Sequence, residues 1–126
     1  MGCGNSKPTP IVDGAKKLQD AADIGDYTQI QLLLDGGVSP NTPSPSKWTP
    51  LHTAGGRGDT KVAQLLLDRG AELQAKESFA STTPLHCATE DGQYGCTKLF
   101  LERGADIHCR DFLQETPLHR AAKGTL

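Results

Sequence analysis

The chain has 126 residues, a formal net charge of −2 at pH 7 and a pI of about 6.0. This length is enough for one compact domain, and a balance without a basic excess argues against nucleic acid as a partner. Aromatic residues make up only 5% of the chain, so a core must come from leucine, alanine, valine and isoleucine. That composition suits small repeated helices better than a large β-sandwich.

The first residues, Met1-Gly2-Cys3-Gly4-Asn5-Ser6, fit the pattern for N-myristoylation. Because one myristoyl chain binds a membrane only marginally (association constant ~10⁴ M⁻¹), stable anchoring needs a second signal. Cys3 supplies it as a site for a second, thioester-linked acyl chain. We therefore expect residues 1–14 to form a flexible tether with Gly2 and Cys3 as lipidation sites. The alternative is a chance match, and acylation requires a eukaryotic cell.

The longest apolar run is too short to span a bilayer, and no secretory signal peptide is visible. The four cysteines form no C-x-x-C pair, so a reducing, intracellular setting with free thiols is the simplest interpretation. Together with the acylation pattern, this predicts a cytoplasmic protein at the cytoplasmic face of a membrane.

Three sequence markers recur with a period of 33 or 34 residues. Thr49-Pro50-Leu51-His52 returns at residues 83–86 and 116–119. The triplet Leu32-Leu33-Leu34 returns as leucines at 65–67 and as Leu-Phe-Leu at 99–101. A Gly-Asp pair at 25–26 and 58–59 becomes Gly-Gln at 92–93. Agreement between three independent markers indicates a genuine internal repeat.

Each unit is expected to contain two short helices and a turn. In the second unit these are about Pro50–Gly55 and Lys61–Arg69, because threonine before proline caps a helix start and Gly70 ends the second helix. Residues 71–81 lack a helical period and predict an extended turn or hairpin. One unit cannot bury its own apolar face, whereas stacked units bury a continuous ladder of leucines.

The T-P-L-H-x-A opening, the L-L-L-x-x-G-A close and the period together resemble the ankyrin repeat. The resemblance runs from Ala15 to the C-terminus. It implies an all-α solenoid of stacked helix–turn–helix units joined by β-hairpin-like loops. About three and a half repeats are expected, at residues 15–43, 44–76, 77–110 and, in part, 111–126. The first lacks T-P-L-H, as suits an N-terminal capping repeat.

The fourth repeat holds only a first helix. This truncation predicts reduced coverage of four apolar side chains, namely Leu85, Cys96, Leu99 and Leu118. A fragment, a naturally short product and an end capped by a partner each account for it.

The hairpins depart from the family pattern. Family repeats usually carry glycine two residues before the T-P-L-H threonine, where this chain has Lys47, Ser81 and Gln114. We therefore expect looser turns or turns of another type. One extra residue lies within Ala75–Thr82.

The residues that suggest chemistry are explained by the repeat. His52, His86 and His119 recur at the repeat period, and the resemblance implies that each bonds the backbone of a neighbouring hairpin. Cys87, Cys96 and Cys109, with His86 and His108, lack the close pairing of zinc ligands, so buried thiols are the better interpretation. No G-x-S-x-G, P-loop or H-E-x-x-H motif is present. We predict no enzyme, cofactor, metal or small-molecule substrate.

One loop carries a candidate modification site. Ser44 precedes Pro45 and Lys47, which resembles a proline-directed kinase site. Phosphate there would add a charge of about −1.5 to −2. A plain proline-rich loop is the simpler alternative.

The resemblance also implies where a partner binds, since ankyrin stacks dock proteins on hairpin tips and on the exposed side of the first helices. Position by position, this predicts Trp48, Arg57, Lys76, Phe79, Thr82, Glu90, Asp91, Arg110, Phe112, Leu113 and Glu115. The predicted function is a monomeric, lipid-anchored adaptor or scaffold that binds another protein. The alternatives are a soluble stoichiometric inhibitor of an enzyme and the N-terminal part of a larger ankyrin protein.

Overall fold

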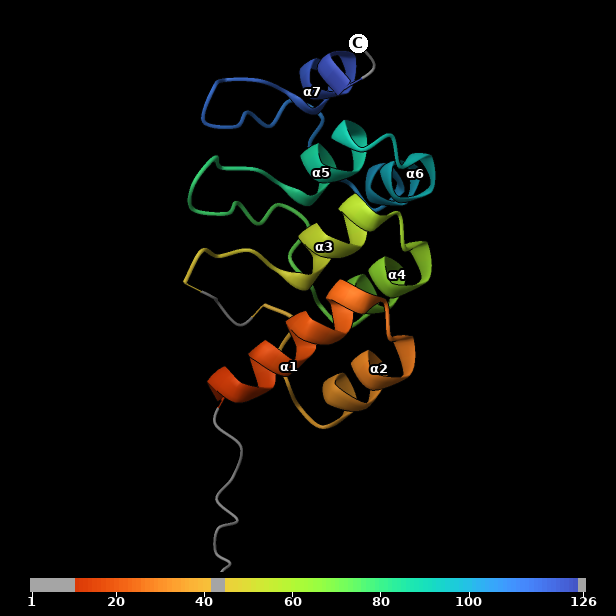
Figure 1. Ribbon diagram of the computed structural model, residues 1–126. Coiled ribbons are helices and arrows are strands. Elements are labelled where there is room, and N and C mark those ends of the chain that lie inside the picture. Colours follow the sequence, from red (N-terminus) through yellow and green to blue (C-terminus); the bar gives the residue numbers. More distant parts are fainter. Residues whose placement is uncertain (1–10, 42–44, 125–126) are drawn as a thin grey trace, which may run out of the picture.

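The computed structural model describes residues 11–41 and 45–124. The predicted lipidation sites Gly2 and Cys3 and the candidate phosphorylation site Ser44 lie outside these residues. Within the described ranges the chain forms seven helices and no strand (Figure 1). They are α1 (Ile11–Ile24), α2 (Tyr27–Asp35), α3 (Pro50–Arg57), α4 (Thr60–Asp68), α5 (Pro84–Glu90), α6 (Tyr94–Glu102) and α7 (Pro117–Gly124).

The helices stack in two columns. The first helices of the repeats, α1, α3, α5 and α7, form one column, and α2, α4 and α6 form the other, while the loops project to one side (Figure 1). This confirms the all-α ankyrin solenoid. Helix α1 begins at Ile11, so the tether expected over residues 1–14 is already helical in its last four positions.

Capping residues set the helix starts. The hydroxyl oxygens of Thr49 and Thr83 accept from the backbone N–H of His52 and His86, and each histidine Nδ1 accepts from the threonine N–H in return. A capping box of this kind satisfies two amides at the helix N-terminus. The second helices start differently, since the Asp59 carboxylate caps α4. The predicted boundaries in the second repeat shift by only one or two residues.

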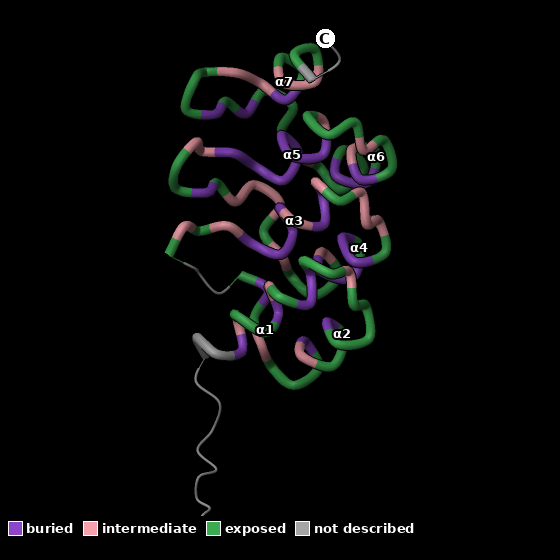
Figure 2. Tube along the Cα trace, in the orientation of Figure 1, coloured by how far each residue is buried: buried purple, intermediate pink, exposed green. Residues whose placement is uncertain are grey.

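The hydrophobic core lies between the two columns of helices, and its buried segments are shown in purple in Figure 2. Its fully buried members include Leu18, Ile30, Leu51, Val62, Leu66, Leu85, Cys96 and Phe100. Helix α7 packs on α5 and so covers the first helix of repeat three despite the short fourth repeat.

The truncation therefore has a smaller effect than expected. Leu85, Cys96 and Leu99 are buried, and the prediction of reduced coverage was wrong for them. It was right for Leu118, whose side chain is 77% exposed, because no helix follows α7 in the described residues. Of the helices that the structure describes, none combines the length and apolar character required to span a membrane.

Candidate protein-binding face

The loops that precede α3, α5 and α7 stack on one another through the backbone. The Ser78 amide donates to the Ser46 carbonyl at 2.7 Å, and the Phe112 amide donates to the Ala80 carbonyl at 2.7 Å. One bond of this kind links each loop to the next. The three loops therefore present their tips on the same side of the solenoid (Figure 1).

Three residues at these loops adopt the left-handed backbone conformation usually reserved for glycine. The φ angles are 60° at Lys47, 54° at Ser81 and 64° at Gln114. These are the positions where family members carry glycine. Each loop therefore has at this position the backbone conformation that glycine favours, and a non-glycine residue adopts it at a steric cost.

A buried carboxylate organises each of the last two loops. Glu77 accepts from the amides of Phe79, Ala80 and Thr82 at 2.8, 2.6 and 3.2 Å. Burial acts to raise the pKa of the Glu77 carboxyl, but these amide bonds outweigh it and hold the pKa below its ordinary value. The loop backbone is thus anchored from within.

Asp111 has the equivalent role in the next loop, where it accepts from the amides of Leu113 and Glu115 at 2.9 and 2.8 Å. Burial opposes ionisation here too, yet the amides and the Arg120 guanidinium lower the pKa of the Asp111 carboxyl.

The repeated histidines connect each repeat to the following loop. Nε2 of His52 lies 2.7 Å from the Thr82 carbonyl, and Nε2 of His86 lies 2.9 Å from the Glu115 carbonyl. Both pKa values lie below the ordinary value, chiefly because burial disfavours the charged ring. A neutral ring with its proton on Nε2 fits these contacts. The structural role expected for His52 and His86 is confirmed. Among the described residues, the ring of His119 bonds Thr116 at the start of its own helix, and the expected contact with a neighbouring hairpin is not found for it.

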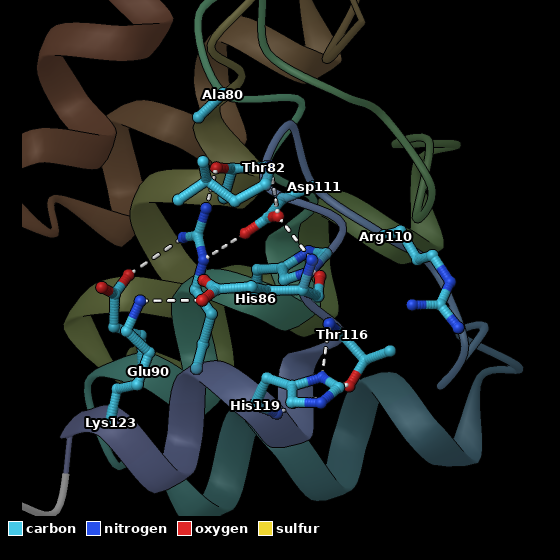
Figure 3. A network of polar contacts seen from close by, with 12 residues as sticks. Ala80, Thr82, His86, Glu90, Arg110, Asp111, Thr116, His119 and Lys123 are labelled. Atoms are coloured by element: carbon cyan, nitrogen blue, oxygen red, sulfur yellow. Dashed lines mark hydrogen bonds and ion pairs between the residues drawn. The ribbon is translucent and has the colours of Figure 1, made fainter.

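Arg120 connects α7 to repeat three, a role that the repeat pattern did not predict. Its guanidinium donates to Asp111 Oδ2 at 2.8 Å, to Glu90 Oε1 at 3.1 Å and to Thr82 Oγ1 at 2.8 Å. Figure 3 shows Thr82, Asp111 and Glu90 lying around this network of polar contacts. Arg120 occupies the variable position of the T-P-L-H-x-A motif, where the earlier repeats have the small residues Thr53 and Cys87. A large charged residue at this position is the sequence feature that could have indicated its role.

The predicted binding residues differ in how much they are exposed. Phe79 and Phe112 are 79% and 70% exposed, and Leu113 is also exposed, so neither phenylalanine folds back over its own loop. Five charged members of the set are exposed, namely Arg57, Lys76, Glu90, Asp91 and Arg110. Phe79 and Phe112 lie on successive loops that the Phe112–Ala80 bond joins. Phe79, Phe112 and Leu113 therefore lie exposed on two adjacent loops that are bonded to each other.

Three of the predicted binding residues are less exposed to a partner. Thr82 is buried and receives a hydrogen bond from Arg120, so its inclusion as a contact residue was wrong. Glu115 is half-buried and pairs with Lys123 at 2.7 Å. Trp48 is half-buried: its ring stacks on His52 with centroids 4.8 Å apart, and its Nε1–H donates to Thr53 Oγ1 at 2.7 Å. Trp48 consequently supports the loop as well as lining its surface.

The cysteines are part of the core. Cys87, Cys96 and Cys109 are buried, and burial raises the pKa of the Cys87 thiol to about 12. In the described residues, no three His, Cys, Asp or Glu side chains group in a way that could hold a metal ion.

Comparison with known proteins agrees with the geometry. A family model for ankyrin repeats, in three copies, matches residues 18–111. The chain is similar to the gibbon (Nomascus leucogenys) and human forms of ankyrin repeat, SAM and basic leucine zipper domain-containing protein 1. Each is 39% identical over 62 residues, which are 49% of this chain and 13% of that protein.

A plant relative matches a similar stretch. Serine/threonine-protein kinase 12 of Arabidopsis thaliana is 38% identical over 71 residues, or 56% of this chain and 16% of the kinase. The chain thus matches less than a fifth of each of these longer relatives. Because the family model covers most of the chain and the helices stack as that family requires, the chain belongs to the ankyrin-repeat family.

Proposed function

We propose that the chain is an adaptor that binds another protein through its loop tips, and not an enzyme. The observation that carries this proposal is the exposure of Phe79, Phe112 and Leu113 on successive, mutually bonded loops. Aromatic side chains are enriched in the cores of protein interfaces. Buried carboxylates and histidines hold the backbone beneath these residues, so little ordering entropy is lost on binding.

A binding experiment with a matched control tests this face. The purified chain is immobilised, and proteins retained from a eukaryotic cell extract are cross-linked and identified for the wild type, the Phe79→Ala/Phe112→Ala variant and Tyr94→Ala. Tyr94 is 78% exposed but belongs to α6, in the other helix column. A partner retained by wild type and Tyr94→Ala but lost from the double variant supports the proposal. Retention of the same proteins by all three contradicts it.

We also propose that the N-terminus anchors the adaptor to the cytoplasmic face of a membrane, with acyl chains on Gly2 and Cys3. The support is the acylation pattern itself and the need for two chains for stable anchoring. The test compares the cellular position of a C-terminal fluorescent fusion with its Gly2→Ala and Cys3→Ser variants. Membrane signal that both changes abolish supports dual acylation. Diffuse signal in all three leaves a soluble protein binder.

A further inference from the structure

A pocket of about 400 Å³ opens between the loops of repeats two and three and helix α1. It is lined by Gln19, Asp23, Ser46, Trp48, Glu77 and Phe79. Its volume is at the lower end of the range of about 300–1,000 Å³ for ligand pockets, which suits one long side chain. The pocket adjoins the proposed binding face through Phe79.

The lining favours a cation. Of the described residues that form it, two are carboxylates, two are aromatic and none is basic. Glu77 is already engaged with three amides, whereas the Asp23 carboxylate is exposed and accepts from Gln19 Nε2 at 2.9 Å. Arg57 approaches Asp23 but donates to its backbone carbonyl, at 2.8 Å. Aromatic rings beside a carboxylate attract a positively charged group.

Gln19, which lines the pocket, is held in place by hydrogen bonds. Gln19 Nε2 donates to Asp23 Oδ1 and to Thr53 Oγ1, the latter at 2.6 Å, and this orients the amide. A planar ligand with several N–H donors matches such a lining better than a compact ammonium, because a guanidinium stacks on rings and forks toward oxygen acceptors.

This chemistry belongs to one layer of the stack. One repeat later, 34 residues on, Gln19, Asp23 and Trp48 are replaced by Thr53, Arg57 and Thr82. The carboxylate becomes a cation, and the large aromatic becomes a small, buried residue. A cationic group would therefore be recognised at a defined position along the face.

We propose that this pocket binds an arginine side chain of the partner protein. The inference rests on the proposed function and sharpens it, since it names the chemistry that a bound segment presents between Trp48 and Phe79. The Asp23 carboxylate would receive the guanidinium, and the two rings would flank it.

Trp48 is the only tryptophan, so its indole N–H gives one NMR signal at the pocket. The chain is titrated with N-acetyl-arginine-N-methylamide, with the lysine analogue and with the citrulline analogue, which keeps the shape without the charge. We expect the arginine probe to bind about threefold to tenfold more tightly than either of the others. Asp23→Asn should remove this advantage while leaving citrulline binding unchanged, and the asparagine still accepts from Gln19. Glu102→Gln, on α6, is the control.

Equal binding of citrulline and arginine, no shift with any probe, or an arginine affinity indifferent to Asp23→Asn overturns the proposal. Lysine binding as tight as arginine also overturns it. If the arginine preference is absent but the Phe79→Ala/Phe112→Ala variant still loses its partner, the proposed function stands and only the pocket assignment fails. If the arginine preference is present but the double variant keeps its partner, the pocket assignment stands and the proposed binding face fails.

Discussion

Glu77 and Asp111 perform the same task in loops that differ by one residue. The Glu77 carboxylate reaches the amide of Thr82, five residues on, whereas the Asp111 carboxylate reaches that of Glu115, four residues on. The backbone hydrogen bonds that close the two loops join the same pairs of residues. The Glu77 amide donates to the Thr82 carbonyl, and the Asp111 amide donates to the Glu115 carbonyl. One additional methylene in the side chain thus accompanies the one additional residue found in Ala75–Thr82.

This match predicts that Glu77→Asp destabilises the protein although it keeps the charge. The shorter side chain cannot reach all three amides, and losing bonds to a buried charged group costs about 1.5–3 kcal/mol. Urea denaturation measures the change in the free energy of unfolding. Glu102→Asp, at an exposed site on α6, should change it by less than about 0.5 kcal/mol. Equal effects of the two substitutions would contradict the role given to Glu77.

Acid should weaken the fold in two separate ranges of pH. The pKa values of His52 and His86 are lowered in the folded state, so the unfolded chain binds more protons below the ordinary value of 6.5, and stability falls as pH drops below it. The lowered pKa values of Glu77 and Asp111 give stability that is present above the ordinary values of 4.5 and 3.8 and is lost at lower pH.

The measurement is the urea midpoint between pH 8 and pH 3. His52→Gln should flatten the first decline without altering the second. An unchanged first decline in that variant would show that His52 does not cause it.

Glycine at the left-handed positions should stabilise the chain. Ser81→Gly and Gln114→Gly each remove a steric cost of about 1 kcal/mol at φ values of 54° and 64°, less the entropy that glycine loses on folding. We expect a higher thermal midpoint for each variant. Ser78→Gly, in the same loop but without a positive φ, should lower it or leave it unchanged. A decrease for both Ser81→Gly and Gln114→Gly would mean that their side chains stabilise the turns.

Two leucines of the repeated triplets should respond very differently to truncation. Leu66 is fully buried in the ladder, so Leu66→Ala should cost about 2–5 kcal/mol. Leu32 is 61% exposed, and Leu32→Ala should cost less than about 1 kcal/mol. Chemical denaturation measures the free energy of unfolding of the two variants. A similar loss in both would contradict the placement of Leu66 in the core.

Arg120 should hold the last helix in place. Arg120→Ala removes contacts to Asp111, Glu90 and Thr82, and we expect faster amide exchange across α7, with a loss of about 1–3 kcal/mol in local stability. Arg103→Ala, which breaks the more exposed pair with Asp68, should cost about 0–1 kcal/mol. Hydrogen exchange resolved by residue distinguishes the two. Unchanged protection of α7 in Arg120→Ala would show that helix packing alone retains it.

The sequence by itself determined the repeat, its period and the helix starts. These features depend on local rules: threonine before proline caps a helix, and apolar side chains at helical spacing must face a neighbouring unit. Each rule acts within a few residues and recurs every 33 or 34, so the pattern is visible without coordinates. The partner residues were predicted from the family resemblance and remain predictions.

Only the tertiary structure decided which side chains are available and which are engaged. Thr82 and Phe79 look equally suitable in the sequence, yet one is buried beneath Arg120 and the other is exposed. The Glu77 carboxylate and the left-handed Ser81 likewise depend on how a loop closes in three dimensions. The pocket between Trp48 and Asp23 joins residues from different repeats. Such contacts follow from the packing of units against one another, which no short sequence pattern encodes.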